Sequence, residues 1–217
     1  MRKLFFLSLL MMQLIIGNAQ NEVRFGLQTG ATMFTFKADV SISNAIASTV
    51  PPINEFSALA NFQAGFWFEK RLNSLLSIRW EVERSPGGAK AYDILEEREK
   101  RYKFFYLSSP IIVKLTAFQK KIRHPIQLEA GVAANLFLFD YGEDITFGTV
   151  NKWHYHTIVG LTRNLDNKWA ISIRYLRDLT PFSTFEAGGV RVNWTNNRYV
   201  LSFSRALFTI QKKKKSP

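Results

Sequence analysis

Eight charged residues recur on the more polar side of alternating segments, and they are the first candidates for chemistry: Arg24, Glu69, Arg79, Glu81, Glu83, Lys114, Glu129 and Arg174. Successive side chains of an extended strand point to opposite faces, so these residues share the polar faces of their strands. Isolated buried charges cost roughly several kcal/mol unless they are paired or wetted. We therefore interpret the set as a plug of mutual ion pairs. A proton or ion path is the alternative.

Two histidines, His154 and His156, stand two positions apart, so both imidazoles fall on one face of a strand. This spacing suits a metal ion, but a site needs further ligands. No third His or Cys lies nearby, because His124 belongs to a turn expected at the opposite end. We predict no metal and no cofactor.

Residue types for a lipid esterase are present in Ser172 or Ser202, a histidine and Glu129. Their spacing gives no support, since the chain lacks a Gly-x-Ser-x-Gly turn. The absence of cysteine excludes a thiolate nucleophile, a thiolate metal site and a disulfide framework. We predict no catalytic residue, and hence no enzyme.

The elements that position these residues are eight strand-like segments of alternating polarity. Their approximate ranges are 23–37, 60–69, 76–83, 105–116, 126–138, 153–162, 168–175 and 198–209. The third is the most regular, with Leu76, Ile78, Trp80 and Val82 on one face. Pro110 interrupts the fourth, which predicts a bulge or kink there.

Long and short connections alternate between the segments. The long ones are near 38–57, 85–101, 140–152 and 179–196, and the short ones near 70–74, 118–125 and 164–167. This rhythm predicts an all-β fold, a closed antiparallel up-and-down eight-stranded transmembrane β-barrel of the outer membrane with both termini in the periplasm. A soluble periplasmic barrel that binds an apolar ligand is the alternative, with its apolar face inward. The mixed charges of 92–101 suit a solvated loop, or else a short helix or partner-binding segment.

The first 19 residues have the form of a secretory signal peptide, with Arg2 and Lys3 before an apolar run and a cleavage site after Ala19. This leaves a barrel domain over 20–210 and a basic tail over 211–217. The net charge of +12 does not require nucleic acid, because many cations fall at short turns or the C-terminus: Lys70, Arg71, Lys120, Lys121, Arg123, Arg163, Lys168 and Lys212 to Lys215. There they would meet lipid headgroup phosphates, so we expect outer-membrane lipids as partners. Ordinary solvated turns are the alternative.

Several segments resemble the PorT-type outer-membrane β-barrel family of Bacteroidota. They are the glycine-spaced opening strand Phe25 to Gly30, the segment Leu75 to Glu83 followed by Gly87-Gly88-Ala89-Lys90, the Tyr-Leu-x-x-Pro segment Tyr106 to Lys114, and Glu129-Ala130-Gly131. The resemblance spans nearly the whole mature chain, and the basic tail departs from the family's usual ending. It implies a cell-envelope protein with a structural or accessory role in transport or secretion, with envelope or secretion-machinery proteins as partners. The alternative from another class is a small outer-membrane enzyme that modifies lipids.

Overall fold

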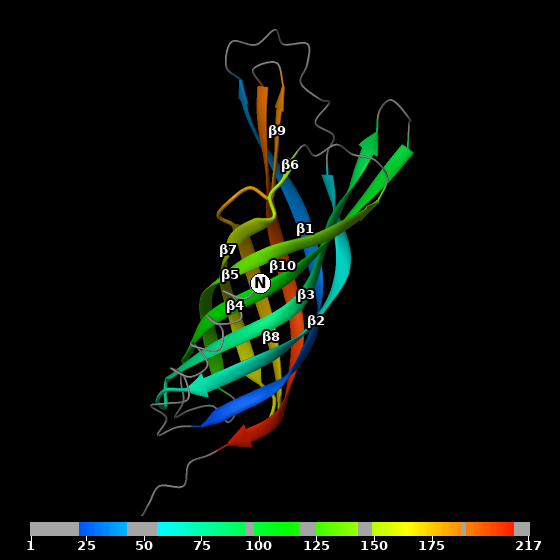
Figure 1. Ribbon diagram of the computed structural model, residues 1–217. Helices are drawn as coiled ribbons and strands as arrows, with labels where there is room; N and C mark the ends of the chain where they lie inside the picture. Colours follow the sequence, from blue (N-terminus) through cyan, green and yellow to red (C-terminus); the bar gives the residue numbers. More distant parts are fainter. Residues whose placement is uncertain are drawn as a thin grey trace, which may run out of the picture.

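The computed structural model describes residues 22–42, 56–93, 98–117, 125–142, 149–187 and 190–210. Eight antiparallel strands form a closed ring (Figure 1), as the alternating pattern predicts. In ring order they are β1 (Val23–Ile42), β2 (Phe56–Arg71), β3 (Leu76–Asp93), β4 (Arg98–Thr116), β5 (Ile126–Gly142), β7 (Trp153–Asn164), β8 (Trp169–Asp178) and β10 (Val190–Ile210). The first and last strands pair along their length, which closes the barrel without a free edge there.

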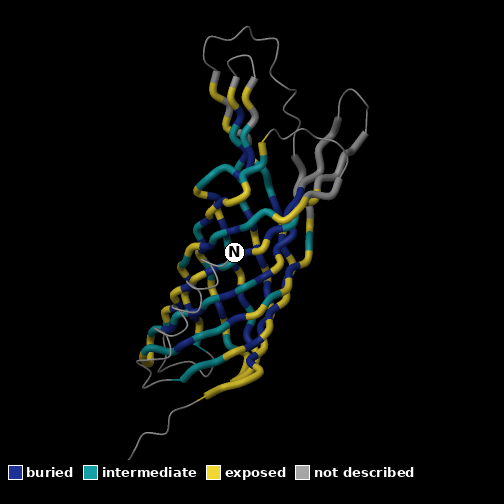
Figure 2. Tube along the Cα trace, viewed as in Figure 1, coloured by how far each residue is buried: buried dark blue, intermediate teal, exposed yellow. Residues whose placement is uncertain are grey.

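Buried and exposed residues alternate along the strands of the barrel (Figure 2), as a membrane-spanning wall requires. Outward side chains are large and apolar, and Val132 and Ile173 are 53% and 62% exposed. Inward side chains are buried and mostly polar. The predicted assignment of faces is confirmed, including inward Trp67, whose ring fits because it lies against Gly26 of β1.

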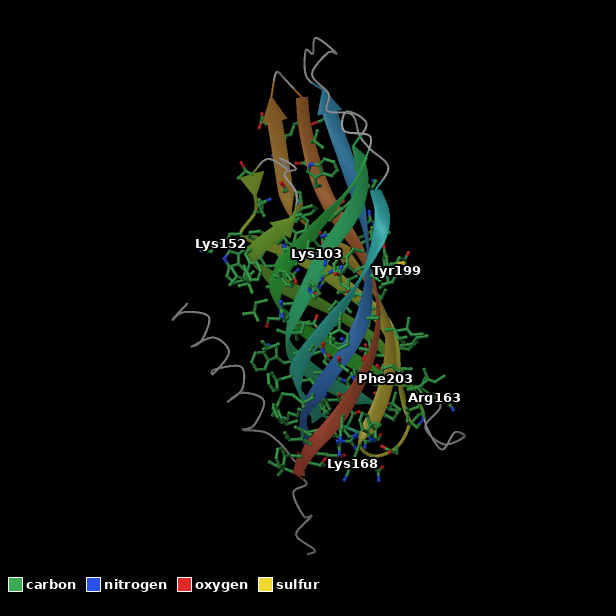
Figure 3. The ribbon with its side chains drawn as sticks, turned by 90° about the vertical axis from the view of Figure 1, so that its right-hand side faces the viewer. Lys103, Lys152, Arg163, Lys168, Tyr199 and Phe203 are labelled. Atoms are coloured by element: carbon green, nitrogen blue, oxygen red, sulfur yellow. The ribbon has the colours of Figure 1, made fainter. Side chains whose placement is uncertain are left out.

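The two ends of the barrel are unequal. Val23 pairs with Ile210, so the first and last described strand residues lie at one end, together with the tight turns 72–75 and 165–168; we call this the short-turn end. Arg163 and Lys168 lie near this end in Figure 3, whereas Lys103 and Lys152 lie toward the opposite, long-loop end. Lys168 is exposed in the turn before β8, where the sequence predicts a cation.

Strands at the long-loop end reach much further than the sequence pattern predicts. β3 and β4 stay paired up to Asp93 and Arg98, so the described parts of 85–101 are strand rather than loop or helix. Within 179–196, β9 (Ser183–Ala187) pairs with the start of β10, and β6 (Thr149–Val150) pairs with β9. The extensions of β3 and β4 and the strand β9 lack the apolar-polar alternation of a lipid-facing wall, so periodicity did not reveal them. The start of β10 does alternate, but its apolar residues Val192 and Trp194 are buried, the reverse of a lipid-facing pattern.

Pro110 interrupts the wall as predicted, but without a bulge at that residue. Pairing of β3 with β4 lapses between Trp80–Ile111 and Glu83–Ser108 with no change of register. Proline has no N–H to donate, so a local loss of ladder bonds is expected. The register shift in β4 falls instead between Phe105 and Tyr106, against β5.

The predicted signal peptide and basic tail, residues 1–19 and 211–217, lie outside the described residues, as do Lys120, Lys121, Arg123 and His124. Within the described ranges, no helix has the length and apolar character to cross a membrane.

Candidate functional site

A network of charged side chains crosses the lumen from wall to wall. Arg174 of β8 donates from Nη1 and Nη2 to the two carboxylate oxygens of Glu81 of β3, each at 2.8 Å. These strands lie four places apart in the ring of eight, on opposite walls. A planar guanidinium matched to a carboxylate by two parallel bonds is the strongest form of such a pair.

Further ion pairs tie the neighbouring walls to this bridge. Arg174 Nε lies 2.6 Å from Glu129 of β5, and Lys114 Nζ of β4 lies 3.2 Å from Glu129 and 3.1 Å from Glu69 of β2. Arg79 pairs with Glu81 at 2.8 Å. We call these six residues the ionic plug: Glu69, Arg79, Glu81, Lys114, Glu129 and Arg174. The predicted mutual pairing of inward charges is therefore present.

Polar groups complete the plug on the side of β1 and β2. Gln28 Nε2 donates to Glu81 and Glu83 at 2.8 and 2.9 Å, and Arg79 donates to Gln28 Oε1 at 2.8 Å. Arg79 also stacks over the Trp67 ring, 4.3 Å from its centroid. Glu83 accepts hydrogen bonds from the side-chain amides of Gln28 and Gln63, at 2.9 and 3.3 Å.

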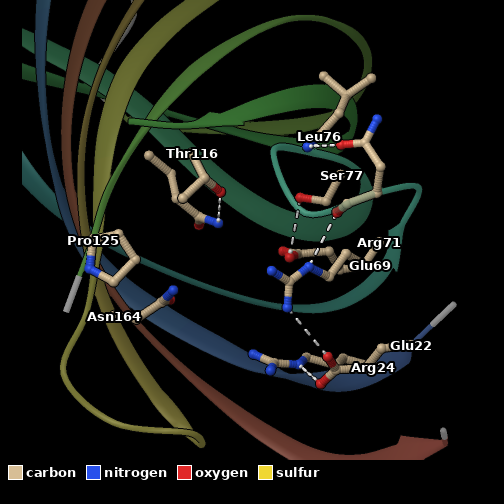
Figure 4. A pocket seen from close by; sticks show the side chains of 11 residues that line it. Glu22, Arg24, Glu69, Arg71, Leu76, Ser77, Thr116, Pro125 and Asn164 are labelled. Atoms are coloured by element: carbon tan, nitrogen blue, oxygen red, sulfur yellow. Dashed lines mark hydrogen bonds and ion pairs between the residues drawn. The ribbon is translucent and has the colours of Figure 1, made fainter. Parts of the chain in front are cut away.

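Of the two predicted inward charges outside the plug, Glu83 is joined to it through Gln28, and Arg24 stands apart. It pairs with Glu22 at the short-turn end, beside a cavity of about 110 Å³ whose lining includes Glu22, Arg24, Glu69 and Arg71 (Figure 4). Arg71 donates to the backbone carbonyls of Asn73 and Ser74, and Ser77 donates to Glu69. The charged groups that line this cavity are therefore paired with one another or hydrogen-bonded to the neighbouring turn.

On the long-loop side of the plug, the lumen contains an apolar layer that the sequence analysis did not predict. Five buried side chains, one from each of five strands, make one cluster: Ile112, Ala133, Ile158, Leu176 and Val200. They share the inward parity of the plug residues. The inward face is thus not uniformly polar, and the pattern of charges alone did not show this.

Toward the long-loop end follows a second buried polar group, which we call the histidine cluster: His154, His156, Asp178 and Arg198. His154 and His156 are fully buried and face the lumen as predicted. Asp178 of β8 stands directly opposite His156 of β7. Arg198 of β10 contacts His156 Nδ1 and donates to Ser85 Oγ at 2.9 Å.

Aromatic side chains lie next to the histidine cluster, on its long-loop side. Phe104 is within ring-stacking distance of Phe36, Phe137 and Phe182, and Tyr106 packs edge-on against His154 at 4.7 Å. Phe34 and Phe182 are fully buried. The lumen is therefore filled by ionic, apolar, polar and aromatic layers in succession.

The residues considered for a hydrolase are not brought together. Ser172 Oγ and Ser202 Oγ lie 2.6 Å apart and bond to each other. Glu129 is engaged by Arg174, Lys114 and Thr162. Among the described side chains, neither serine has a histidine as a hydrogen-bond partner, so the geometry offers no nucleophile and base pair.

Comparison with known proteins identifies the fold of this chain. No protein-family profile matches the chain, and no curated protein matches its sequence significantly. The outer-membrane protein OprG of Pseudomonas aeruginosa matches with a TM-score of 0.54 at 9% identity, over 90% of this chain and 100% of its own. Neisserial surface protein A matches with a TM-score of 0.44 at 13% identity, over 83% and 96%. Outer membrane protein W of E. coli matches with 0.43 at 13%, over 85% and 97%. The chain has the fold of a small eight-stranded outer-membrane β-barrel.

Proposed function

We propose that this protein is an integral outer-membrane barrel with a structural or accessory role in envelope transport or secretion, and that it carries out no catalysis itself. The observation that carries this proposal is the Arg174–Glu81 bridge, which joins opposite walls of the lumen. An eight-stranded barrel is only just wide enough to be filled by side chains, and here four layers fill it. Such an interior fits a rigid framework better than a diffusion pore.

The outward face supports the location. Its exposed apolar side chains would be unfavourable in water and are favourable in lipid, which argues against the soluble ligand-binding barrel. With the short-turn end in the periplasm, as in other outer-membrane barrels, both ends of the described chain face that compartment. The resemblance to the PorT-type family supports partners in secretion or envelope assembly.

The lipid-modifying enzyme is the competing proposal. Lipid reaches only the outer wall, whereas the serines, histidines and carboxylates considered for catalysis are all inside it and buried. A reaction on lipid would need a nucleophile and base within reach of the substrate. This arrangement favours the accessory role.

A deletion strain tests the proposal. We expect loss of the gene to impair secretion or envelope integrity, and both the wild type and a His154→Ala, His156→Ala double variant to restore them. Insertion is checked by membrane fractionation and by heat-modifiable migration on gels. A double variant that inserts normally but fails to restore the phenotype would place chemistry at the imidazoles and overturn the non-catalytic proposal.

A further inference from the structure

The histidine cluster has the geometry of a metal site. His156 of β7 and Asp178 of β8 are a directly opposed pair in the sheet, and His154 lies two residues along on the same face. Directly opposed residues hold their Cβ atoms about 4.5–5.5 Å apart, so the backbone register alone brings the three side chains together. Their donor atoms all lie within 4.8 Å of one another.

The polar atoms of these side chains call for a partner. All three residues are more than nine-tenths buried, and neither ring nitrogen of His154 has a hydrogen-bond partner. Asp178 Oδ1 has none either, while its Oδ2 accepts from the backbone N–H of Asn196 at 2.9 Å. Buried polar groups are normally satisfied, and those that are not indicate an ion, a water or a functional constraint.

We propose that His154, His156 and Asp178 bind one divalent transition-metal ion of the zinc class inside the barrel. Two imidazoles and one carboxylate are a ligand set that Zn²⁺ takes, with bonds of about 2.0–2.2 Å. Ligands of one tetrahedral ion are then about 3.4 Å apart, so side-chain rotation within the cluster suffices to close around it. The fourth position remains open for water.

A supporting shell is in place around these ligands. Asn135 lies with its amide 2.6 Å from His156 Nδ1, and its Oδ1 has no other partner. Arg198 Nη2 meets the same Nδ1 atom, so metal binding requires Arg198 to turn away from His156. With the amide of Asn135 then turned so that Oδ1 faces the ring, Nδ1–H donates to Oδ1 and Nε2 presents its lone pair to the metal. The Asn196 N–H holds Asp178 in the same way.

The positive charge of Arg198 disfavours a metal cation at the histidine cluster and so lowers the affinity of the site for the ion. Its guanidinium contacts His156, so its positive charge acts directly on the site. The lumen as a whole is not cationic, however. Apart from the Arg24–Glu22 pair at the short-turn end, the lumenal charges described above are four basic and five acidic: Arg79, Lys114, Arg174 and Arg198 against Glu69, Glu81, Glu83, Glu129 and Asp178. Removal of Arg198 should therefore strengthen metal binding rather than weaken it.

The test uses the full mature barrel without an affinity tag, in detergent micelles, with Co²⁺ and Zn²⁺ as probes. The ion is added both to the folded protein and during refolding, because the aromatic layer covers the cluster. We expect one ion per chain, and a visible Co²⁺ absorption typical of nitrogen and oxygen ligands. His154→Ala, His156→Ala and Asp178→Asn should each weaken binding at least about tenfold.

Two matched variants make the result specific. His124→Ala removes the remaining histidine of the chain and should leave binding unchanged. Arg198→Gln should tighten it. Absence of binding by the wild type after both loading routes overturns the proposal, as does binding that survives Asp178→Asn or disappears with His124→Ala. Heat-modifiable migration shows that each variant is folded, and neither result depends on the accessory role.

Discussion

At the scale of single residues, Arg174 makes the shortest ion pair of the ionic plug, 2.6 Å to Glu129. It meets two buried carboxylates, Glu81 and Glu129, on different strands. A buried ion pair contributes little net stability against a well-packed apolar substitute, but loss of one partner leaves an uncompensated charge. The consequence of a single change at Arg174 is therefore larger than its own bonds suggest.

Replacement of Arg174 by Met tests this residue. It should reduce the free energy of unfolding by about 3–5 kcal/mol, because Glu81 and Glu129 lose their shared cation in a site closed to water. Urea titration of the barrel in lipid vesicles measures the change. Arg163→Met, at an exposed position beyond the plug, is the matched control and should stay within about 0.5 kcal/mol. Equal effects at the two sites would contradict the plug.

Which residues face the lumen was predictable from the sequence, but which of them touch was not. Parity placed Arg79, Glu81 and Arg174 inside, yet the pairing of Arg174 with Glu81 depends on barrel closure across the ring. Asp178 and Arg198 have the same parity as Ser172 and Ser202, but both lay next to a segment interpreted as a loop. The third metal-type ligand was missed for that reason: His156 meets Asp178 only through the register of β7 and β8.

At the scale of elements, β5 shows how a strand divides its two faces between lipid and lumen. Val132 is 53% exposed on the outside, and its neighbour Ala133 is buried in the apolar layer. Prediction of such a strand from sequence succeeds where lipid lies on one side, because alternation is then strict. It failed for 85–93, 98–101, 183–187 and 190–197, where the strands extend at the long-loop end.

Substitution of Val132 by Arg tests the lipid face. A guanidinium at mid-strand should cost about 2–4 kcal/mol of folding stability in bilayers, measured by reversible unfolding into urea. Leu165→Arg, in the exposed turn between β7 and β8, should cost only about 0–1 kcal/mol, since it lies at the membrane boundary. Ser77→Arg, on the lumenal face, should be limited by space and charge pairing rather than lipid. A similar tolerance at all three positions would contradict the assignment of faces.

At the scale of the whole molecule, the four layers that fill the lumen predict that the barrel conducts no ions through a stable open pore. We expect planar-bilayer recordings of the wild type to show no stable large conductance, and liposome swelling with sugars to be absent. An Arg174→Ala, Glu81→Ala double variant should stay closed to sugars, because the apolar layer of Ile112, Ile158 and Leu176 remains above the site. A steady, large conductance of the wild type would contradict the filled lumen and indicate a diffusion pore instead.

The pairing of β1 with β10 has a further consequence for biogenesis. The register joins Val23 to Ile210, so the contact that completes the ring is also the most distant along the chain. Such a contact forms late and slowly, because the loop between its ends must first be ordered. Until it forms, both seam strands expose unpaired backbone groups that lipid cannot satisfy. A chain interrupted before β10 should therefore leave the ring open and be unable to reside stably in a membrane.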